Sequence, residues 1–161
     1  MKSHECYMKA ALKLAEQAAI KDEVPVGAVI VCDGKIIAKA HNLRETRRSP
    51  LAHAEIIAIE KAARRLGGWR LTGCTLYVTL EPCPMCAGAM VNARIDEVVF
   101  GAYDPKAGAC GTLYDLTEGR LNHKPKVISG VLESECANVL KEYFKNKRAA
   151  AKSSDLVDLI E

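Results

Sequence analysis

The apolar run Val26–Cys32 is the feature that most limits how this chain of 161 residues can fold. It is rich in β-branched residues and predicts a buried strand. The dipeptide Asp33-Gly34 follows at once, and this pair is the strongest short signal for a two-residue hairpin turn. Lys35–His41 is then the returning strand. The sequence therefore predicts a sheet that begins with an antiparallel hairpin.

Helical and extended segments alternate along the rest of the chain. Apolar residues recur at helical spacing over residues 5–20, and Gly67-Gly68 ends a second helical pattern. The expected elements after the hairpin are helices at Ala54–Leu66, Cys83–Asn92 and Glu133–Arg148, strands at Thr75–Leu80, Val98–Gly101 and Val127–Ser129, and loops at Arg44–Pro50 and 102–125. This order predicts an α/β fold, a three-layer α/β/α sandwich with a central mixed five-stranded sheet.

Composition is that of an ordinary globular protein. Hydrophobic residues make up 49% and charged residues 27%, which excludes a disordered chain. The net charge of +3 excludes a histone-like or ribosomal-type composition, but it permits a local basic patch. The length predicts one domain, residues 1–148, followed by a frayed C-terminal tail at 149–161 that contains Asp155, Asp158 and Glu161.

The seven cysteines indicate the cellular compartment. Their odd number, and an N-terminus without the apolar segment of a secretory signal, argue against a disulfide framework and against export. No apolar run approaches the roughly 20 residues that span a bilayer. We therefore expect a cytoplasmic protein with reduced thiols and no membrane association. Five of the thiols are interpreted as small buried hydrophobic groups: Cys6, Cys32, Cys74, Cys110 and Cys136.

Two short strings carry chemistry, His53-Ala54-Glu55 and Pro82-Cys83-Pro84-Met85-Cys86, and each opens a predicted helix. Cys-x-x-Cys spacing lets two sulfurs converge on one ion, and a helix N-terminus favours thiolates over thiols. Two thiolates and one imidazole form a Cys₂His site for Zn²⁺ that leaves a fourth position open, as in catalytic zinc sites. We expect one zinc per subunit, held by His53, Cys83 and Cys86, and no organic cofactor.

Glu55 is the candidate catalytic residue. It lies two residues from His53, an offset that points side chains about 200° apart in a regular helix. We therefore expect His53 at the helix cap and Glu55 in the first turn, facing the metal-bound water without ligating the metal. There it can act as general base and then as general acid.

Three other interpretations stay open at this point. A structural zinc needs a fourth protein ligand, and no second Cys-x-x-Cys supplies one. A thiol–disulfide oxidoreductase using Cys83 and Cys86 leaves the His-x-Glu string without a role. A zinc-stabilised RNA-binding module without catalysis leaves Glu55 unexplained.

The two strings together match the signature of the zinc-dependent nucleobase deaminases. Longer strings resemble the bacterial tRNA-specific adenosine deaminases over roughly residues 5–148: His41-Asn42, Ala52-His-Ala-Glu55, Leu76–Met90, and Val98–Lys106 with Gly108. The resemblance implies a cytidine deaminase-like fold. It also implies conversion of adenosine to inosine at the wobble position of a tRNA anticodon, chiefly that of tRNA-Arg with anticodon ACG. A free-base or nucleoside deaminase shares the zinc strings and is the alternative enzyme.

The resemblance also implies partners and substrate contacts. Asn42 matches a residue that hydrogen-bonds the flipped adenine, Asp104 a loop position that contacts the anticodon, and Phe144 a position near the anticodon loop. The family forms homodimers, and the small residues Ala87–Ala89 permit close approach of a second subunit or of the sheet.

Basic residues gather in three clusters that could follow the phosphates of the tRNA anticodon stem-loop. Arg44 follows Asn42 closely and is expected to bind substrate. The clusters are Arg44, Arg47 and Arg48; Arg64, Arg65 and Arg70; and Lys141, Lys145, Lys147, Arg148 and Lys152.

Overall fold

The computed structural model describes residues 2–158. Its elements follow one another in the order α1 (His4–Ile20), β1 (Gly27–Cys32), β2 (Lys35–His41), α2 (Arg44–Arg47), α3 (Ala54–Leu66), β3 (Cys74–Leu80), α4 (Pro84–Asn92), β4 (Glu97–Ala102), β5 (Lys126–Ile128) and α5 (Glu133–Asp158). The predicted helices and strands are all present, with ends that differ by a residue or two except at α5.

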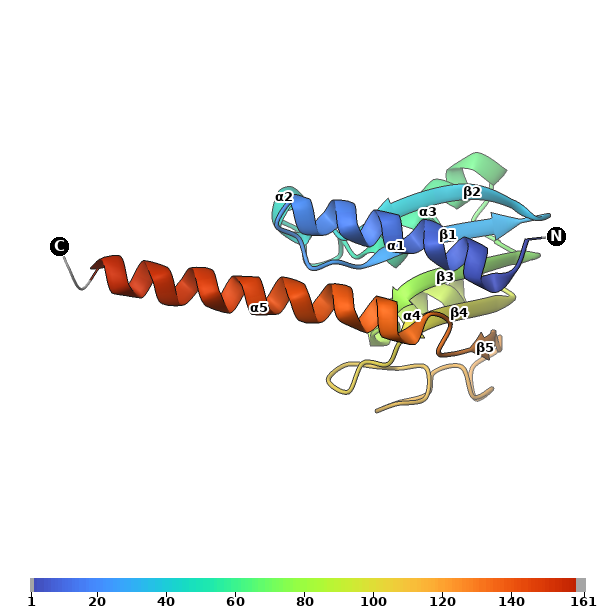
Figure 1. Cartoon of the computed structure of the whole chain (residues 1–161). Helices are drawn as coiled ribbons and strands as arrows, with labels where there is room; N and C mark the ends of the chain where they lie inside the picture. Colours follow the sequence, from blue (N-terminus) through green and yellow to red (C-terminus); the bar gives the residue numbers. More distant parts are fainter. Residues whose placement is uncertain (1, 159–161) are drawn as a thin grey trace.

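The sheet has five strands in the order β2-β1-β3-β4-β5. β1 is antiparallel to both of its neighbours, whereas β3, β4 and β5 run parallel. α3 and α4 pack together behind one face, and α1 and α5 cover the other, as Figure 1 shows. The three-layer α/β/α sandwich with a mixed sheet is confirmed.

Alternate residues of each central strand enter opposite layers. In β1, Ala28 and Ile30 join the core under α3 and α4, while Val29 and Val31 join the core under α1. Both faces are therefore apolar, which is why β1 reads as an unbroken apolar run. α1 lies so close to the sheet that a Cβ on Gly27 would stand 1.9 Å from the Ala11 carbonyl oxygen.

Two expectations about local structure were wrong. Arg44–Arg47 forms the short helix α2 within the predicted loop. α5 continues to Asp158 instead of ending at Arg148, because the alanines and lysine that follow are strong helix formers. The end of this helix projects beyond the sheet (Figure 1), and Glu161 lies outside the described residues. The division into a domain and a tail stays a prediction.

The cysteines outside the Cys-x-x-Cys pair differ in burial. Cys74, Cys110 and Cys136 are buried, and burial raises the pKa of each to about 12, so they are inert thiols as expected. Cys32 is half-buried. Cys6 is exposed, which contradicts the expectation for that residue, because it lies on the outer face of α1. Among the described residues, no helix has the length and apolar character to cross a membrane.

Candidate functional site

Two helix N-termini meet at one end of the sheet. His53 is the N-cap residue of α3 and Cys83 is the N-cap residue of α4, both with extended backbone. Pro84 begins α4 with the backbone angle that a first helical residue needs. Neither cap side chain bonds to its own helix. Serine, threonine or aspartate would cap better, so both positions hold residues suited to ligation rather than to helix stability.

The imidazole and the two sulfurs converge. His53 Nδ1 lies 3.6 Å from Cys83 Sγ and 3.4 Å from Cys86 Sγ. The three ligand atoms all lie within 4.8 Å of one another, so this group can hold a metal ion. Cys86 is fully buried in the first turn of α4, and the other two residues are half-buried.

The pair of thiols shares one proton unequally. The pKa of Cys83 is lowered to about 4, chiefly because Cys86 donates a hydrogen bond to its sulfur, with further hydrogen bonds from His53 and the Cys86 backbone. The pKa of Cys86 is raised, because its thiol is that donor and because it is buried. A thiolate at the N-terminus of α4 is thus favoured even before a cation is considered.

Glu55 follows the N-cap by two residues, in the first turn of α3, as the sequence predicted. Its side chain is only 4% exposed. Burial raises the pKa of Glu55 to about 7, against the opposing effects of its own backbone N–H and of His53. A carboxyl group with this pKa can both accept and release a proton near neutral pH.

A cavity of about 420 Å³ opens beside these residues. His53, Glu55 and Cys83 line it, together with the four residues predicted to bind substrate: Asn42, Arg44, Asp104 and Phe144. The volume lies in the range of small-ligand sites. The structure therefore brings all the predicted site residues to one place, with Cys86 behind the cavity wall.

Asn42 and Asp104 each use part of their hydrogen-bonding capacity within the protein. Asn42 Nδ2 donates to the Val24 carbonyl oxygen at 3.3 Å, and Asn42 Oδ1 accepts the Arg44 N–H at 3.3 Å. Asp104 Oδ1 accepts the N–H groups of the second and third residues after it, at 2.9 and 3.2 Å. One Asn42 donor and the Asp104 Oδ2 atom keep capacity for a ligand.

Sequence reasoning missed the role of the Glu81 side chain, a buried carboxylate that lines the cavity. Its oxygens accept hydrogen bonds from the N–H groups of Asp104, Cys110 and Thr112 and from the Thr112 hydroxyl, at 2.6–3.2 Å. A Cβ on Gly108 would stand 2.2 Å from Glu81 Oε2. Glu81 therefore holds the loop that carries Asp104. Its sequence signal was an acidic residue directly after a buried strand.

Comparison with known proteins agrees with this geometry. A family model described as MafB19-like deaminase matches residues 2–148. The tRNA-specific adenosine deaminase of Bacillus subtilis (strain 168) is 56% identical over 158 residues, which is 95% of this chain and 98% of that protein.

Solved structures of deaminases have the same fold. One from a study of A-to-I editing by tRNA:A34 deaminases at the wobble position matches with a TM-score of 0.81 and 46% identity, covering 84% of this chain and 99% of the other. The guanine deaminase of Bacillus subtilis matches with a TM-score of 0.63 and 42% identity, covering 69% and 71%. Since identity with the adenosine deaminases extends over almost all of both chains, this chain belongs to the tRNA-specific adenosine deaminase family and is an enzyme that removes an amino group by hydrolysis.

Proposed function

We propose that the enzyme converts adenosine to inosine at the wobble position of a tRNA anticodon, chiefly that of tRNA-Arg with anticodon ACG. The observation that carries this proposal is the buried Glu55 beside the His53, Cys83 and Cys86 ligand group, in a cavity whose wall includes the exposed Arg44 and Phe144. A cavity of this kind takes one base while its surroundings meet the flanking RNA. Because tRNA is used in the cytoplasm, the enzyme acts there.

Zinc is the metal that the ligand group fits. In a tetrahedral site with Zn–S bonds of about 2.3 Å and Zn–N bonds of about 2.0–2.1 Å, sulfur and nitrogen lie about 3.5–3.6 Å apart. The corresponding distances here are 3.4 and 3.6 Å. Three protein ligands of this type leave the fourth position open, as in catalytic sites. When bound, the zinc would lower the pKa of a water molecule and supply a nucleophile at neutral pH.

Glu55 moves the protons of the reaction. Its carboxylate takes a proton from the attacking water and gives it to the ring nitrogen next to the reacting carbon. It then takes the remaining proton from the hydroxyl group on that carbon and gives it to the departing amino group, so that water and adenosine yield inosine and ammonia. Burial supports both roles, because it raises the pKa of Glu55 to about 7.

Substrate binding falls to the residues around the cavity. The free donor of Asn42 pairs with the adenine edge, and Asp104 Oδ2 accepts from a sugar hydroxyl or a base edge of the anticodon loop. Phe144 is 44% exposed and offers a face on which an unstacked base can lie.

Arg44 is proposed to contact an RNA phosphate, since within residues 2–158 it has no acidic partner. Replacing Arg44 by alanine is expected to weaken binding of an anticodon stem-loop and to reduce the slope of log affinity against log salt by about 0.7–0.9. Fluorescence anisotropy at several salt concentrations measures both. Arg120→Ala is the matched control, because this exposed arginine already pairs with Glu118 at 2.9 Å. A wild-type affinity that does not change with salt would contradict the phosphate role.

A homodimer is proposed through the open face of α4. Apart from its chain neighbours and the backbone of its own helix, no atom in the described part of the chain lies within 4 Å of a Cβ built on Gly88, although glycine weakens a helix. Gly88→Arg is therefore expected to shift the protein from dimer to monomer in sedimentation velocity at micromolar concentration. Gly68→Arg, at another glycine with open space, should stay dimeric. A wild-type monomer at this concentration would contradict the proposal.

Anticodon specificity is tested with a set of stem-loops that differ only at the anticodon. Inosine should form fastest on the ACG loop, and loops with other residues beside the target adenosine should react more slowly. Equal rates on all loops would contradict the preference for tRNA-Arg. Turnover of free guanine in place of RNA would favour the activity named for the Bacillus subtilis neighbour.

A further inference from the structure

The turn after α1 has a strained residue at its centre. Asp22 has φ of +56°, in the left-handed region that glycine adopts most easily. Its N–H donates to the Ala19 carbonyl at 3.0 Å, and the Glu23 N–H donates to the Ala18 carbonyl at 2.9 Å. This pattern is a Schellman motif, which usually has glycine at that position. An aspartate there points to a role for its side chain.

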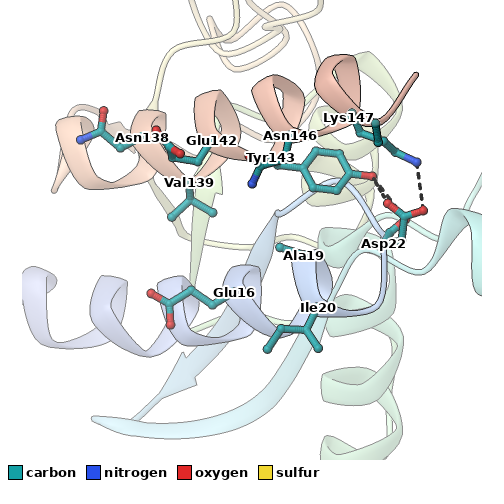
Figure 2. Close-up of a pocket in the computed structure, with 11 residues that line it drawn as sticks. Glu16, Ala19, Ile20, Asp22, Asn138, Val139, Glu142, Tyr143, Asn146 and Lys147 are labelled. Carbon is teal, nitrogen blue, oxygen red and sulfur yellow. Dashed lines mark hydrogen bonds and ion pairs between the residues drawn. The ribbon is translucent and has the colours of Figure 1, made fainter. Parts of the chain in front are cut away.

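The side chain of Asp22 faces outward and holds α5. Tyr143 Oη donates to the Asp22 carbonyl oxygen at 3.3 Å and to Oδ1 at 3.1 Å, and Lys147 Nζ donates to Oδ2 at 2.9 Å. Figure 2 shows these bonds at one end of the cavity between α1 and α5, which has a volume of about 680 Å³. Tyr143 and Lys147 lie one helical turn apart, and Phe144 is the next residue after Tyr143. The contact therefore joins the turn after α1 to the part of α5 that carries Phe144 to the catalytic cavity.

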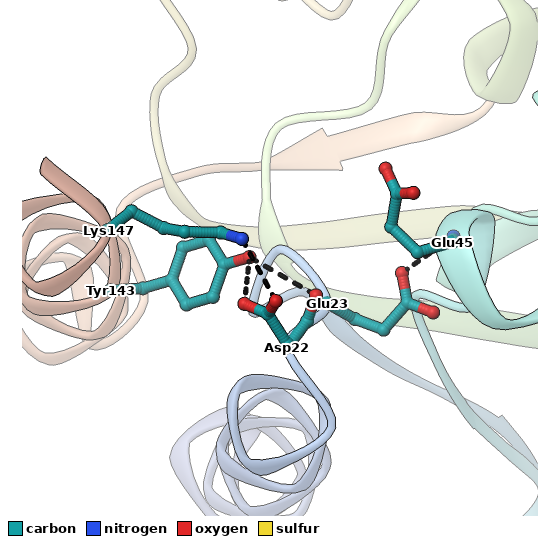
Figure 3. Close-up of polar contacts among 5 residues, drawn as sticks. All are labelled: Asp22, Glu23, Glu45, Tyr143 and Lys147. Carbon is teal, nitrogen blue, oxygen red and sulfur yellow. Dashed lines mark hydrogen bonds and ion pairs between the residues drawn. The ribbon is translucent and has the colours of Figure 1, made fainter. Parts of the chain in front are cut away.

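The side chain of Glu23 faces inward and holds α2. It is fully buried, and one of its oxygens accepts the N–H group of Glu45 at 2.9 Å, as Figure 3 shows. The other oxygen accepts the N–H group of Thr46 at 2.8 Å. These N–H groups belong to the first turn of α2, whose N-cap residue Leu43 provides no side-chain cap. Glu23 thus replaces the missing cap.

Few other contacts fix the position of α2. It has four residues, too few to be stable alone, and within residues 2–158 its backbone approaches no other helix or strand closely. Its first residue is Arg44. The Arg44 N–H donates to Asn42 Oδ1 at 3.3 Å, and the next two N–H groups of the helix donate to Glu23, so both side chains fix the position of Arg44.

We propose that Asp22 and Glu23 form a positioning pair that places Phe144 and Arg44 at the catalytic cavity and so determines how tightly RNA is bound. The inference rests on the proposed function. Phe144 and Arg44 line both the catalytic cavity and an adjoining one of about 610 Å³, whereas Asp22 and Glu23 line only the second. The pair acts on RNA binding and not on the proton transfers, because neither residue reaches the reacting base.

Asp22→Gly is the decisive variant. It removes the side chain and at the same time relieves the strained backbone, so the folded state should be as stable as wild type or more so. RNA binding should nevertheless weaken: Kd and KM for an ACG stem-loop are expected to rise about five- to tenfold, which corresponds to the loss of one typical hydrogen bond. The kcat value should stay within about twofold of wild type, since Glu55 is untouched.

Two further variants test the contact between Asp22 and Tyr143. Tyr143→Phe removes only the hydroxyl and should also raise Kd. The double variant with Asp22→Gly and Tyr143→Phe should have a Kd no higher than that of the single variant with the higher Kd, because both substitutions remove the same interaction. Asp22→Asn keeps an acceptor for Tyr143 and should restore part of the affinity. Lys126→Ala is the matched control: it breaks an exposed ion pair with Glu97 at 3.4 Å on β4 and β5 and should leave Kd unchanged.

The outcomes separate this inference from the proposed function. Inosine formation by the wild-type enzyme tests the proposed function. The ratio of variant to wild-type Kd tests the positioning role of Asp22. A Kd for Asp22→Gly and Tyr143→Phe equal to that of wild type overturns the positioning role. A fall in kcat with unchanged Kd and KM overturns it as well.

Discussion

Replacing Glu55 by glutamine is expected to lower kcat for inosine formation by about a thousandfold or more, because the amide cannot carry a proton between water and base. The metal content should stay at one zinc per subunit, since Glu55 lies beside the ligand group but is not part of it. Single-turnover assays on an anticodon stem-loop and metal analysis by mass spectrometry give the two values.

The control for this variant is Glu60→Gln, which removes the charge of an exposed glutamate from the same helix. It should keep both activity and zinc. Loss of zinc from Glu55→Gln would contradict the assignment, because it would make Glu55 a ligand. Full activity of that variant would contradict the role in proton transfer.

Cys86→Ser is expected to abolish zinc binding and activity together. Cys86 is fully buried, its sulfur lies 3.4 Å from His53 Nδ1, and no fourth His, Cys, Asp or Glu in the described part of the chain belongs to this ligand group. A ligand that binds only the folded state stabilises it, and loss of the metal should lower the melting temperature by about 5–10 °C. Thermal unfolding and metal analysis check this, and a chelator added to wild type should reproduce the shift.

Cys110→Ser is the matched control, because Cys110 is also buried near the site but lies outside the ligand group. The substitution alters buried packing and so affects stability, and the deciding value is therefore the zinc content, which should remain at one per subunit. A full zinc content in Cys86→Ser would contradict the assignment of this ligand.

Most of the fold could be predicted from the sequence, because its signals are local. The Asp33-Gly34 turn, the apolar strands and the Gly67 end of α3 each depend on neighbouring residues, and β1, β2 and α3 were found where these signals lie. The ligand group was predictable for the same reason, since His53 and Cys83 each open a helix and need only that the two helix ends meet.

The residues that hold the surroundings of the cavity could not be predicted, because their partners are distant in the chain. Glu23 bonds to N–H groups 22 and 23 residues away, and Asp22 bonds to Tyr143 across 121 residues. Without knowledge of those contacts, Arg44–Arg47 reads as a polar loop and Asp22 as a solvated charge. A short helix that depends on a remote carboxylate leaves no periodic pattern.

The most direct test of the central claim combines metal analysis with inosine formation by the wild-type enzyme on three substrates: an anticodon stem-loop with ACG, free adenosine and free guanine. We predict one zinc per subunit and inosine formation on the stem-loop alone. Turnover of a free base or nucleoside with none on the stem-loop would contradict the account.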